Sequence, residues 1–356
     1  MPRSLGLGLS YRAWLIPALY AAGAMMIALT GIVFSKGRRF GRTRVSWGLH
    51  VLPMCAALVA ASVTRLPGQE LAPRAYVIAP IDSNAIILTW SFYDGGVNLD
   101  GSVPITGATG RYHVPILSYY HSLSFFGRSA NITASLPYGV GNFQGRVLGT
   151  QKSVYRSGLL DFNVRFSVNL IGGPAMPIEK FAKWRQKTLL GASVKVVMPT
   201  GQYNPAKLVN WGINRWAFKP ELGYSRLWSN NWMLDAYGSV WFFTTNQAFF
   251  NIPVPSRQLE GPIGSFEGHL SRNLGKPRFW VSLDGNFWFG GTTTLGRIQN
   301  SNTRQTSSRA GVTMSVPVGK HQSFKFAFSK GSYVRYGGDY DNVQVAWQYG
   351  WVGWPK

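Results

Sequence analysis

Cysteine is almost absent from this chain of 356 residues. The single one, Cys55, lies in a segment that we expect to be removed, so the mature chain would have no disulfide, thiolate metal site or cysteine nucleophile. Charged residues are scarce as well, at 14% of the chain, against about a quarter in average soluble proteins. The mean hydropathy of -0.02 is nevertheless too low for a bundle of membrane helices. Polarity carried by Ser, Thr, Asn, Gln and Gly is typical of a transmembrane β-barrel.

Acidic residues are few: 13 stand against 36 Lys and Arg, which gives a net charge of +23. So basic a chain favours nucleic acid, an anionic lipid surface or an anionic solute as partner. No basic helix or zinc-ligand spacing is present, and no Arg-rich run occurs after the N-terminus, so nucleic acid is not expected. We expect a basic surface beside the anionic head groups of outer-membrane lipid and lipopolysaccharide.

Long apolar runs are confined to the first 70 residues. A basic patch followed by an apolar run predicts a secretory signal peptide over about residues 36–65, with cleavage between Ala61 and Gln69. Residues 1–69 are therefore taken as an N-terminal extension plus signal peptide. Three origins stay open for residues 1–35, which precede the signal: a start codon assigned too early, an unusually long signal, or a membrane anchor.

Strict alternation of apolar and polar residues takes over after residue 70. Residues 160–170 show it most clearly, with one apolar and one polar face, as in a β-strand between two solvents. We expect the apolar side chains to face acyl chains and the polar ones to face the interior of a barrel. Similar segments predict strands near 85–93, 112–125, 129–138, 157–171, 187–199, 215–227, 231–245, 263–273, 278–290, 308–318, 322–332 and 341–351.

The predicted strands are longer than an average soluble strand and long enough to cross a bilayer when tilted. Short turns alternate with longer loops, and aromatic residues gather near strand ends, as in outer-membrane barrels. The exception is the connection at 172–187, where residues 177–187 predict either a short amphipathic helix or a polar surface loop. For residues 70–356 we therefore predict an all-β, transmembrane, antiparallel up-and-down β-barrel of about twelve strands, with ten or fourteen as alternatives.

Charges on the polar strand faces would point into the barrel. With about twelve strands the bore is modest, so these charges either neutralise one another in a structural network or line a passage. Neighbouring strands offer pairs such as Lys219 with Asp235, or Arg165 and Lys195 around one acid. The lumen-lining candidates are Asp161, Asn163, Arg165, Lys195, Lys219, Glu221, Asp235, Glu267, His269, Asp284 and Lys325.

Catalytic motifs are lacking. The chain has no Gly-x-Ser-x-Gly elbow, no His-Glu-x-x-His zinc motif and no Gly-rich phosphate loop. Some outer-membrane barrels are hydrolases with a Ser and a His on the outer wall, and here Ser271 and His269 share a strand face. Because such neighbours are common on strands, we expect no enzyme, no cofactor and no bound metal, and keep a hydrolase as the last alternative.

One stretch carries a more specific signal. It reads Pro199-Thr200-Gly201-Gln202-Tyr203-Asn204-Pro205, then Asn210, Gly212, Asn214, Arg215 and Trp216, then Phe218-Lys219-Pro220. This stretch resembles the signature of the outer-membrane family named putative MetA-pathway of phenol degradation, and the resemblance extends over about residues 85–351. Gln202 departs from the pattern, since an acidic residue is common there. The end at Trp354-Pro355-Lys356 also lacks the terminal aromatic that many barrels present to their assembly machinery.

The resemblance implies an integral barrel of the Gram-negative outer membrane, inserted by the barrel-assembly machinery, that takes up small aromatic or hydrophobic solutes. In the motif itself, Gly201 permits a positive φ, and Arg215 at the outer rim would meet either lipid phosphate or a loop carboxylate. The leading function is a channel for passive or facilitated passage of a small solute. A structural or adhesion barrel with a plugged lumen is the first alternative, and an outer-membrane hydrolase is the second.

Overall fold

The computed structural model describes residues 71–97, 105–147, 149–207, 209–228, 231–249, 256–275 and 278–353. The expected signal peptide and the extension before it therefore lie outside the described residues, as does the C-terminal tripeptide. No helix in the described part is long and apolar enough to cross a membrane.

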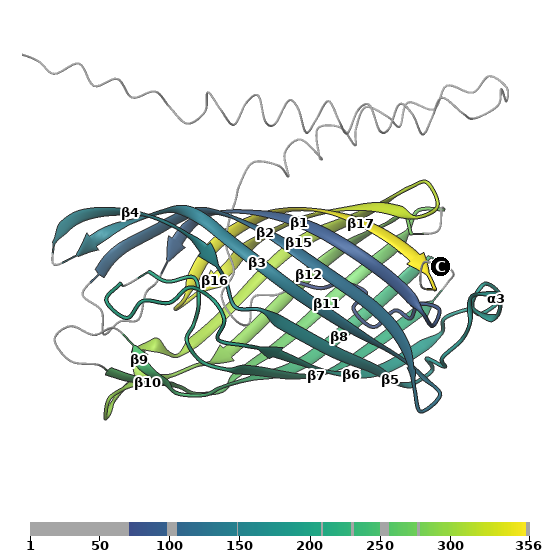
Figure 1. Cartoon of the computed structure of the whole chain (residues 1–356), viewed down its shortest axis with the longest axis horizontal. Helices are drawn as coiled ribbons and strands as arrows, with labels where there is room; N and C mark the ends of the chain where they lie inside the picture. The colour runs from purple at the N-terminus through teal and green to yellow at the C-terminus, as the bar shows by residue number, and fades with distance from the viewer. Residues whose placement is uncertain are drawn as a thin grey trace, which may run out of the picture. The chain divides into compact units, whose positions relative to one another are not determined.

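Twelve antiparallel strands close into a barrel (Figure 1). Each barrel strand pairs with the next one along the chain, and the last pairs with the first, from Ser83 opposite Val352 to Val97 opposite Gly338. The predicted fold class and strand count are confirmed. The barrel strands are β1 (Ser83–Val97), β2 (Ile105–Phe125), β3 (Arg128–Val147), β5 (Asn163–Ile171), β6 (Thr188–Val197), β7 (Ala217–Trp228), β8 (Trp232–Phe243), β11 (Ile263–Asn273), β12 (Trp280–Gly290), β15 (Gln305–Val318), β16 (Gln322–Val334) and β17 (Gly338–Val352).

The two ends of the barrel differ (Figure 1). The end where β1 begins and β17 ends has short turns and the single helical turn α3 (Ile178–Phe181), and we call it the short-turn end. Residues 177–187 are thus mostly irregular. The opposite, long-loop end carries a strand that pairs with the second half of β3, and a separate four-stranded sheet. The additional elements are β4 (Thr150–Leu159), β9 (Asn246–Phe249), β10 (Ser256–Glu260), β13 (Thr293–Leu295), β14 (Ile298–Asn300) and the 3-10 turn η1 (Ser301–Thr303).

The prediction of one continuous strand at 157–171 is wrong. The chain leaves the sheet between Leu159, where β4 ends, and Asn163, where β5 begins. The Leu160 N–H donates to the carbonyl of Pro137 at 3.0 Å, and its side chain packs against a buried aromatic cluster instead of lipid. Alternation continues through the break, so periodicity alone could not reveal it.

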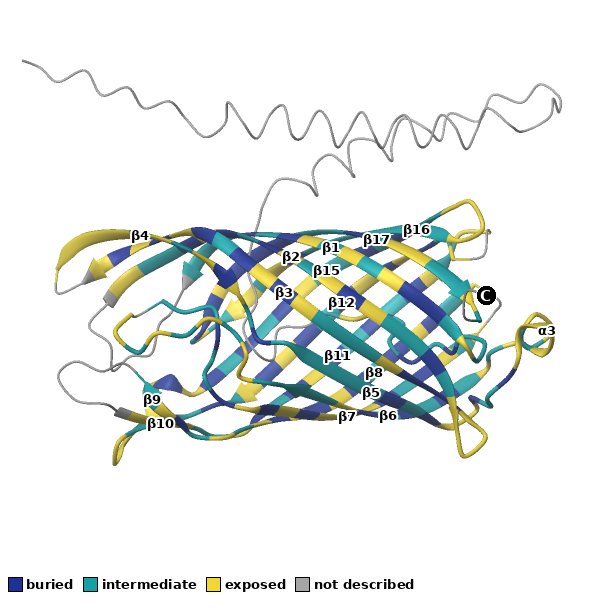
Figure 2. Ribbon diagram, in the orientation of Figure 1, coloured by how far each residue is buried: buried dark blue, intermediate teal, exposed yellow. Residues whose placement is uncertain are grey.

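Burial alternates along the strands, as Figure 2 shows. Large apolar side chains are exposed on the outer face, for example Leu222 at 59% and Leu283 at 63%. Their strand neighbours on the inner face are buried although they are polar, for example Ser225 and Asp235. A protein that exposes leucine and buries serine and aspartate is built for an apolar solvent outside its wall.

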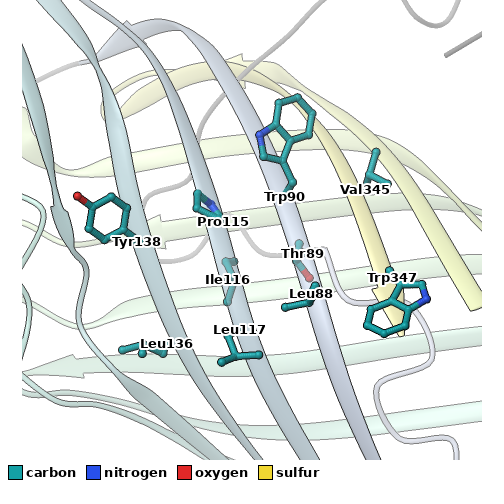
Figure 3. Close-up of a pocket in the computed structure, with 10 residues that line it drawn as sticks. All are labelled: Leu88, Thr89, Trp90, Pro115, Ile116, Leu117, Leu136, Tyr138, Val345 and Trp347. Atoms are coloured by element: carbon teal, nitrogen blue, oxygen red, sulfur yellow. The ribbon is translucent and has the colours of Figure 1, made fainter. Parts of the chain in front are cut away.

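One part of this outer wall is hollowed. A shallow, mainly apolar depression of about 510 Å³ lies over β1, β2, β3 and β17, and Trp90, Leu117 and Trp347 line it (Figure 3). The pairing of β2 with β3 is interrupted beside it, between His113 and Ile116. Pro115 lies in this gap and has no N–H to donate to a neighbouring strand.

Candidate functional site: the lumen and the segment inside it

The inner face of the barrel carries most of the charged residues that the sequence singled out. Alternation along each strand places them there, because every second side chain points inward. Asp161 is the exception, since it lies before β5 and outside any strand. The inner-face positions are Asn163 and Arg165 on β5, Lys195 on β6, Lys219 and Glu221 on β7, Asp235 on β8, Glu267 and His269 on β11, Asp284 on β12 and Lys325 on β16.

Lys219 lies between two carboxylates of the inner wall. Its Nζ is 2.8 Å from Glu221 and 3.2 Å from Glu267. Arg165 reaches the same Glu221 at 3.3 Å. The expected pair of Lys219 with Asp235 is therefore wrong. These charges neutralise one another inside the barrel, where removal of one partner would leave the other buried without compensation.

His269 extends this network toward β12. Its Nδ1 lies 2.9 Å from Asp284 and its Nε2 lies 3.5 Å from Glu267. The hydroxyls of Ser282 and Thr313 donate to Asp284, each at 2.6 Å. The middle of the barrel is thus lined by hydrogen-bonded charges drawn from several neighbouring strands.

The residues considered for a hydrolase do not form a catalytic pair. Ser271 bonds to the Nε of Arg74 at 3.0 Å, and His269 bonds to Asp284. Both are buried inside the barrel, away from its outer wall. Among the described residues, no group of three or more His, Cys, Asp or Glu is placed to hold a metal ion.

The stretch before β1, residues 71–82, runs through the inside of the barrel; we call it the lumen segment. Its backbone is neither strand nor helix, and it is held mainly by side chains of the wall. Ile81 marks where it leaves the short-turn end, since its N–H donates to the carbonyl of Met176 at 2.9 Å. The bonds to the wall are Ala72 N to Glu267 Oε2 at 3.4 Å, Arg74 N to Asp235 Oδ2 at 3.2 Å and Ala75 N to Tyr237 Oη at 3.1 Å.

Arg74 fastens the lumen segment to β11 and β12 of the wall. Besides its bond to Ser271, its guanidinium lies 4.5 Å from the ring of Trp280. Burial lowers the pKa of Arg74 to about 10, an effect that the nearby Asp235 partly offsets. The side chain therefore stays charged at neutral pH and makes a cation–π contact inside the lumen.

Tyr76 is the most deeply buried residue of the segment and fills a fitted socket. Gly191 and Gly223 lie directly opposite each other on β6 and β7. A Cβ on either glycine would lie 2.2 or 2.0 Å from the Tyr76 ring, so the ring rests on bare backbone. Burial, and then the charge of Glu221, raise the pKa of Tyr76 to about 12.

The stretch that resembles the family signature forms a loop anchored by Asp161. The carboxylate accepts the N–H of Gly201 at 2.9 Å and of Ile213 at 2.8 Å. Burial raises the pKa of Asp161, and these N–H groups oppose the rise. Gly201 does not adopt the expected positive φ; it is needed because it approaches Gly212, where a Cβ would lie 2.8 Å from its backbone. The positive φ falls at Asn214, at 54°.

The remaining motif residues tie this loop to its neighbours. Arg215 pairs with Glu260 and is buried, so of its two expected partners the structure shows the loop carboxylate. Trp216 is exposed and stacks on Phe218, and Pro199 and Pro205 lie in the loop. The other contacts are Phe162 N to Thr200 Oγ1 at 2.9 Å, Tyr203 Oη to Ala248 O at 3.1 Å, Asn204 N to Asn210 Oδ1 at 2.8 Å and Asn214 Nδ2 to Asn246 Oδ1 at 2.8 Å.

Aromatic side chains line the lumen at the long-loop end. Trp211 of the motif loop packs on Tyr112 and Phe143, with ring centroids 5.2 and 5.6 Å apart. Tyr93 and Tyr340 belong to the same cluster. A second cluster on the opposite arc of the wall joins Trp241, Ile263 and Trp288. The lumen is therefore aromatic near the long loops and charged in its middle.

Two of these features could not have been found from the sequence. The lumen segment has no periodicity, and its partners lie more than a hundred residues away, as with Tyr76 and Ser193. Trp211 carries a weak signal, since it lies in the motif between Asn210 and Gly212, but nothing in the sequence shows that it turns inward.

The sequence matches the model of the family described as Putative MetA-pathway of phenol degradation over residues 98–345. No curated protein matches it. Among solved structures, the chain is similar to the COG4313 outer membrane channel from Pseudomonas putida F1, with a TM-score of 0.64 and 15% identity over 79% of this chain and 100% of that one. At this identity the likeness shows the fold alone.

Two autotransporter barrels are similar at lower scores. The β domain of the Bordetella autotransporter BrkA gives a TM-score of 0.45 at 10% identity, over 76% of this chain and 100% of that one. The transport unit of AIDA-I from Escherichia coli gives 0.46 at 9% identity, over 85% and 97%.

Proposed function

Because the chain belongs to the family of the putative MetA-pathway of phenol degradation, we propose that it is an integral barrel of the Gram-negative outer membrane through which small aromatic or hydrophobic solutes pass. In such barrels the short turns face the periplasm and the long loops face the exterior. The short-turn end, which holds α3 and the end of β17, is then periplasmic, and the motif loop faces outward.

The aromatic lining of the outer half of the lumen is the observation that supports this solute class most directly. Tyr112, Phe143 and Trp211 on one arc and Trp241 and Trp288 on the other form two packed apolar clusters there, and all but Trp211 are buried. An aromatic solute gains from ring contacts and from leaving water on such a surface, whereas a sugar or an ion would lose hydration there.

The same surface offers a few polar contacts. The indole N–H groups of Trp211 and Trp241 are buried and have no acceptor among the described residues. Each could donate to the single oxygen of a phenol or a similar solute. The lining thus suits a mainly apolar solute that carries one hydrogen-bond acceptor.

The charged middle of the lumen is occupied by the lumen segment. Passage therefore requires this segment to shift, and selectivity comes from the aromatic outer half and from this constriction. Nothing in the proposed mechanism needs an energy source or a cofactor, because the solute moves down its own gradient.

Uptake of the fluorescent aromatic probe 1-N-phenylnaphthylamine by intact cells tests the proposal, since lipopolysaccharide normally excludes it. We expect cells that produce the barrel to take up the probe several-fold faster than cells with an empty vector. Phe143→Asn, which makes the outer half polar, should remove most of this gain. Tyr333→Asn is the matched control, because Tyr333 is an exposed aromatic outside both clusters.

Folding of each variant is checked by heat-modifiable gel mobility, so a loss of uptake is read only from folded barrels. Equal uptake by Phe143→Asn and by the unmodified chain would show that the aromatic lining is irrelevant. Uptake no faster than with the empty vector would contradict the proposed transport function.

A structural or adhesion barrel with a plugged lumen is the second candidate. The observation that favours it is the lumen segment, whose Arg74 bonds to Ser271 on β11 and whose Tyr76 bonds to Glu221 on β7. This candidate predicts no probe uptake and no conductance in planar bilayers, even when the segment is loosened by substitution at Tyr76.

Two partners complete the proposal. Arg146 and Lys152 are exposed on β3 and β4 beyond the apolar belt, where they would contact lipopolysaccharide phosphates. Replacement of both by Gln should weaken binding of purified lipopolysaccharide. Strand β17, which ends in the aromatic-rich stretch with Trp351, would present the insertion signal to the barrel-assembly machinery.

A further inference from the structure

The inner face of β6 and β7 holds a socket shaped for one phenol ring. Gly191 and Gly223 form its floor, and a Cβ at either position would overlap the ring of Tyr76. Gly238 on β8, in contrast, has nothing within 4 Å of its Cβ position. The floor therefore has no side chain where the flat ring lies on it.

The far end of the socket recognises a hydroxyl group. The Tyr76 oxygen lies 3.0 Å from Ser193 Oγ and 3.0 Å from a carboxylate oxygen of Glu221, which accepts its proton in a hydrogen bond. Ser193 and Glu221 are the next inward-facing pair after the two glycines in the same register. A ring without a hydroxyl would make neither bond, and Glu221 would keep its contacts with Arg165 and Lys219.

Two further groups hold the ring itself. The guanidinium of Arg165 lies 5.0 Å from the ring centroid, within cation–π range. The ring of Tyr237 meets it edge-on at 5.2 Å and 63°. Floor, sides and end of the socket thus all belong to barrel strands β5 to β8, whereas only the occupant comes from elsewhere.

The occupant is held by an irregular segment and not by a strand. The lumen segment forms no β-ladder with the wall. The residues before Tyr76 are held by single hydrogen bonds, such as Arg74 N to Asp235 and Ala75 N to Tyr237 Oη. Segments with few backbone bonds open locally at low free energy, while the strands around them stay folded. The socket would survive such an opening intact.

We infer that this socket is a binding subsite for a small phenol, which takes the place of the Tyr76 side chain when the lumen segment moves aside. The inference rests on the proposed passage of aromatic solutes and narrows their class to monohydric phenols. Tyr76 then acts as an internal competitor that keeps the subsite filled and the lumen closed in the absence of solute. Because this competitor is tethered, half-saturation of the unmodified chain is expected at about millimolar solute.

The test uses the purified full chain with 4-methylphenol, which is the tyrosine side chain cut at Cβ, and with toluene, which is the same ring without hydroxyl. In Tyr76→Ala the socket is empty. We expect 4-methylphenol to raise the thermal unfolding midpoint of this variant saturably, with an affinity at least about tenfold tighter than that of toluene. Adding Gly223→Val, which fills the floor, should abolish the effect, while Gly238→Val is the matched control that should leave it.

A second measurement tests whether the solute displaces Tyr76 from the socket of the unmodified segment. It also serves if Tyr76→Ala fails to fold. In the double variant Ala75→Cys with Cys55→Ser, the rate at which a water-soluble maleimide labels the cysteine reports on the lumen segment. We expect 4-methylphenol to accelerate labelling several-fold and toluene to have little effect. Equal action of the two compounds, or binding that persists when Gly223→Val fills the socket, would overturn the subsite.

The outcomes separate this inference from the proposed function. If cells take up 1-N-phenylnaphthylamine but the barrel does not bind 4-methylphenol, the proposed transport function stands and the phenol subsite is wrong. A barrel that binds 4-methylphenol in the socket and admits no probe would keep the subsite, while the proposed passage would be wrong.

Discussion

At the scale of single residues, the inner wall is shaped by glycine as much as by charge. Gly191 and Gly223 are valuable because they have no side chain, so the Tyr76 ring lies directly on the backbone of two paired strands. Gly238, which faces outward, has no such neighbour. A glycine in this barrel is therefore interpreted by what a Cβ would meet, not by its presence in a strand.

This distinction predicts opposite results for two similar substitutions. In Gly223→Ala the new methyl group overlaps the Tyr76 ring, and we expect the free energy of unfolding to fall by about 1–3 kcal/mol, as for other overpacked sites. Gly238→Ala should be neutral or slightly stabilising, because alanine costs less backbone entropy than glycine. Urea unfolding in detergent micelles measures both, and a similar loss in the two variants would contradict the socket.

Tyr76 also predicts a pH dependence. Its pKa is raised to about 12 in the folded protein, from 10.0 ordinarily, so its contribution to stability is complete below about pH 10 and is lost as the pH rises toward 12. The difference in tyrosinate absorbance between the unmodified chain and Tyr76→Phe should show one phenol that titrates about two pH units late. A titration of that phenol near pH 10 would place Tyr76 in water.

At the scale of elements, the motif loop depends on one carboxylate. Asp161 satisfies the N–H groups of Gly201 and Ile213, and both would be left without an acceptor in Asp161→Ala. We expect a loss of about 1–3 kcal/mol, together with faster hydrogen exchange at these two amides. The matched control is Asp94→Ala, which removes an exposed ion pair with Arg111 and should cost less than about 1 kcal/mol. Unchanged exchange at Gly201 would show that Asp161 does not anchor the loop.

The strands that could be predicted from sequence are those that face the apolar exterior on one side and the polar barrel interior on the other along their whole length. Strands β7 and β12 are examples, since their alternation is uninterrupted and their ends agree with the predicted ranges within a few residues. The boundary between β4 and β5 could not be predicted, because Leu160 and Asp161 keep the alternating pattern while they contact a loop and an aromatic cluster.

At the scale of the whole molecule, the barrel wall can be predicted from local sequence patterns, whereas the lumen segment inside it cannot. Strand length and the alternation of turns and loops depend on neighbouring residues, so they are visible in the sequence. The lumen segment depends on contacts such as Arg74 with Asp235, which are 161 residues apart, and on how β8 is turned within a closed wall. No local property of residues 71–82 distinguishes them from a linker.

The lumen segment predicts how the closed barrel conducts ions. When residues 71–80 are replaced by a Gly-Ser stretch of equal length, the side-chain bonds of Arg74 to Ser271 and of Tyr76 to Glu221 are lost, and we expect single-channel conductance to rise several-fold. Tyr76→Phe keeps the ring in its socket and should leave conductance nearly unchanged. Planar-bilayer recording of purified protein measures both, and an unchanged conductance after the replacement would show that this segment does not close the lumen.

The central claim, that this barrel admits aromatic and not polar solutes, is tested most directly by comparing two probes in the same cells. Uptake of 1-N-phenylnaphthylamine reports an apolar aromatic solute, and hydrolysis of nitrocefin by a periplasmic β-lactamase reports a polar anionic one. The account predicts that production of the barrel raises the first several-fold and leaves the second nearly unchanged. Faster nitrocefin hydrolysis without faster uptake of the aromatic probe would contradict it and identify a polar pore.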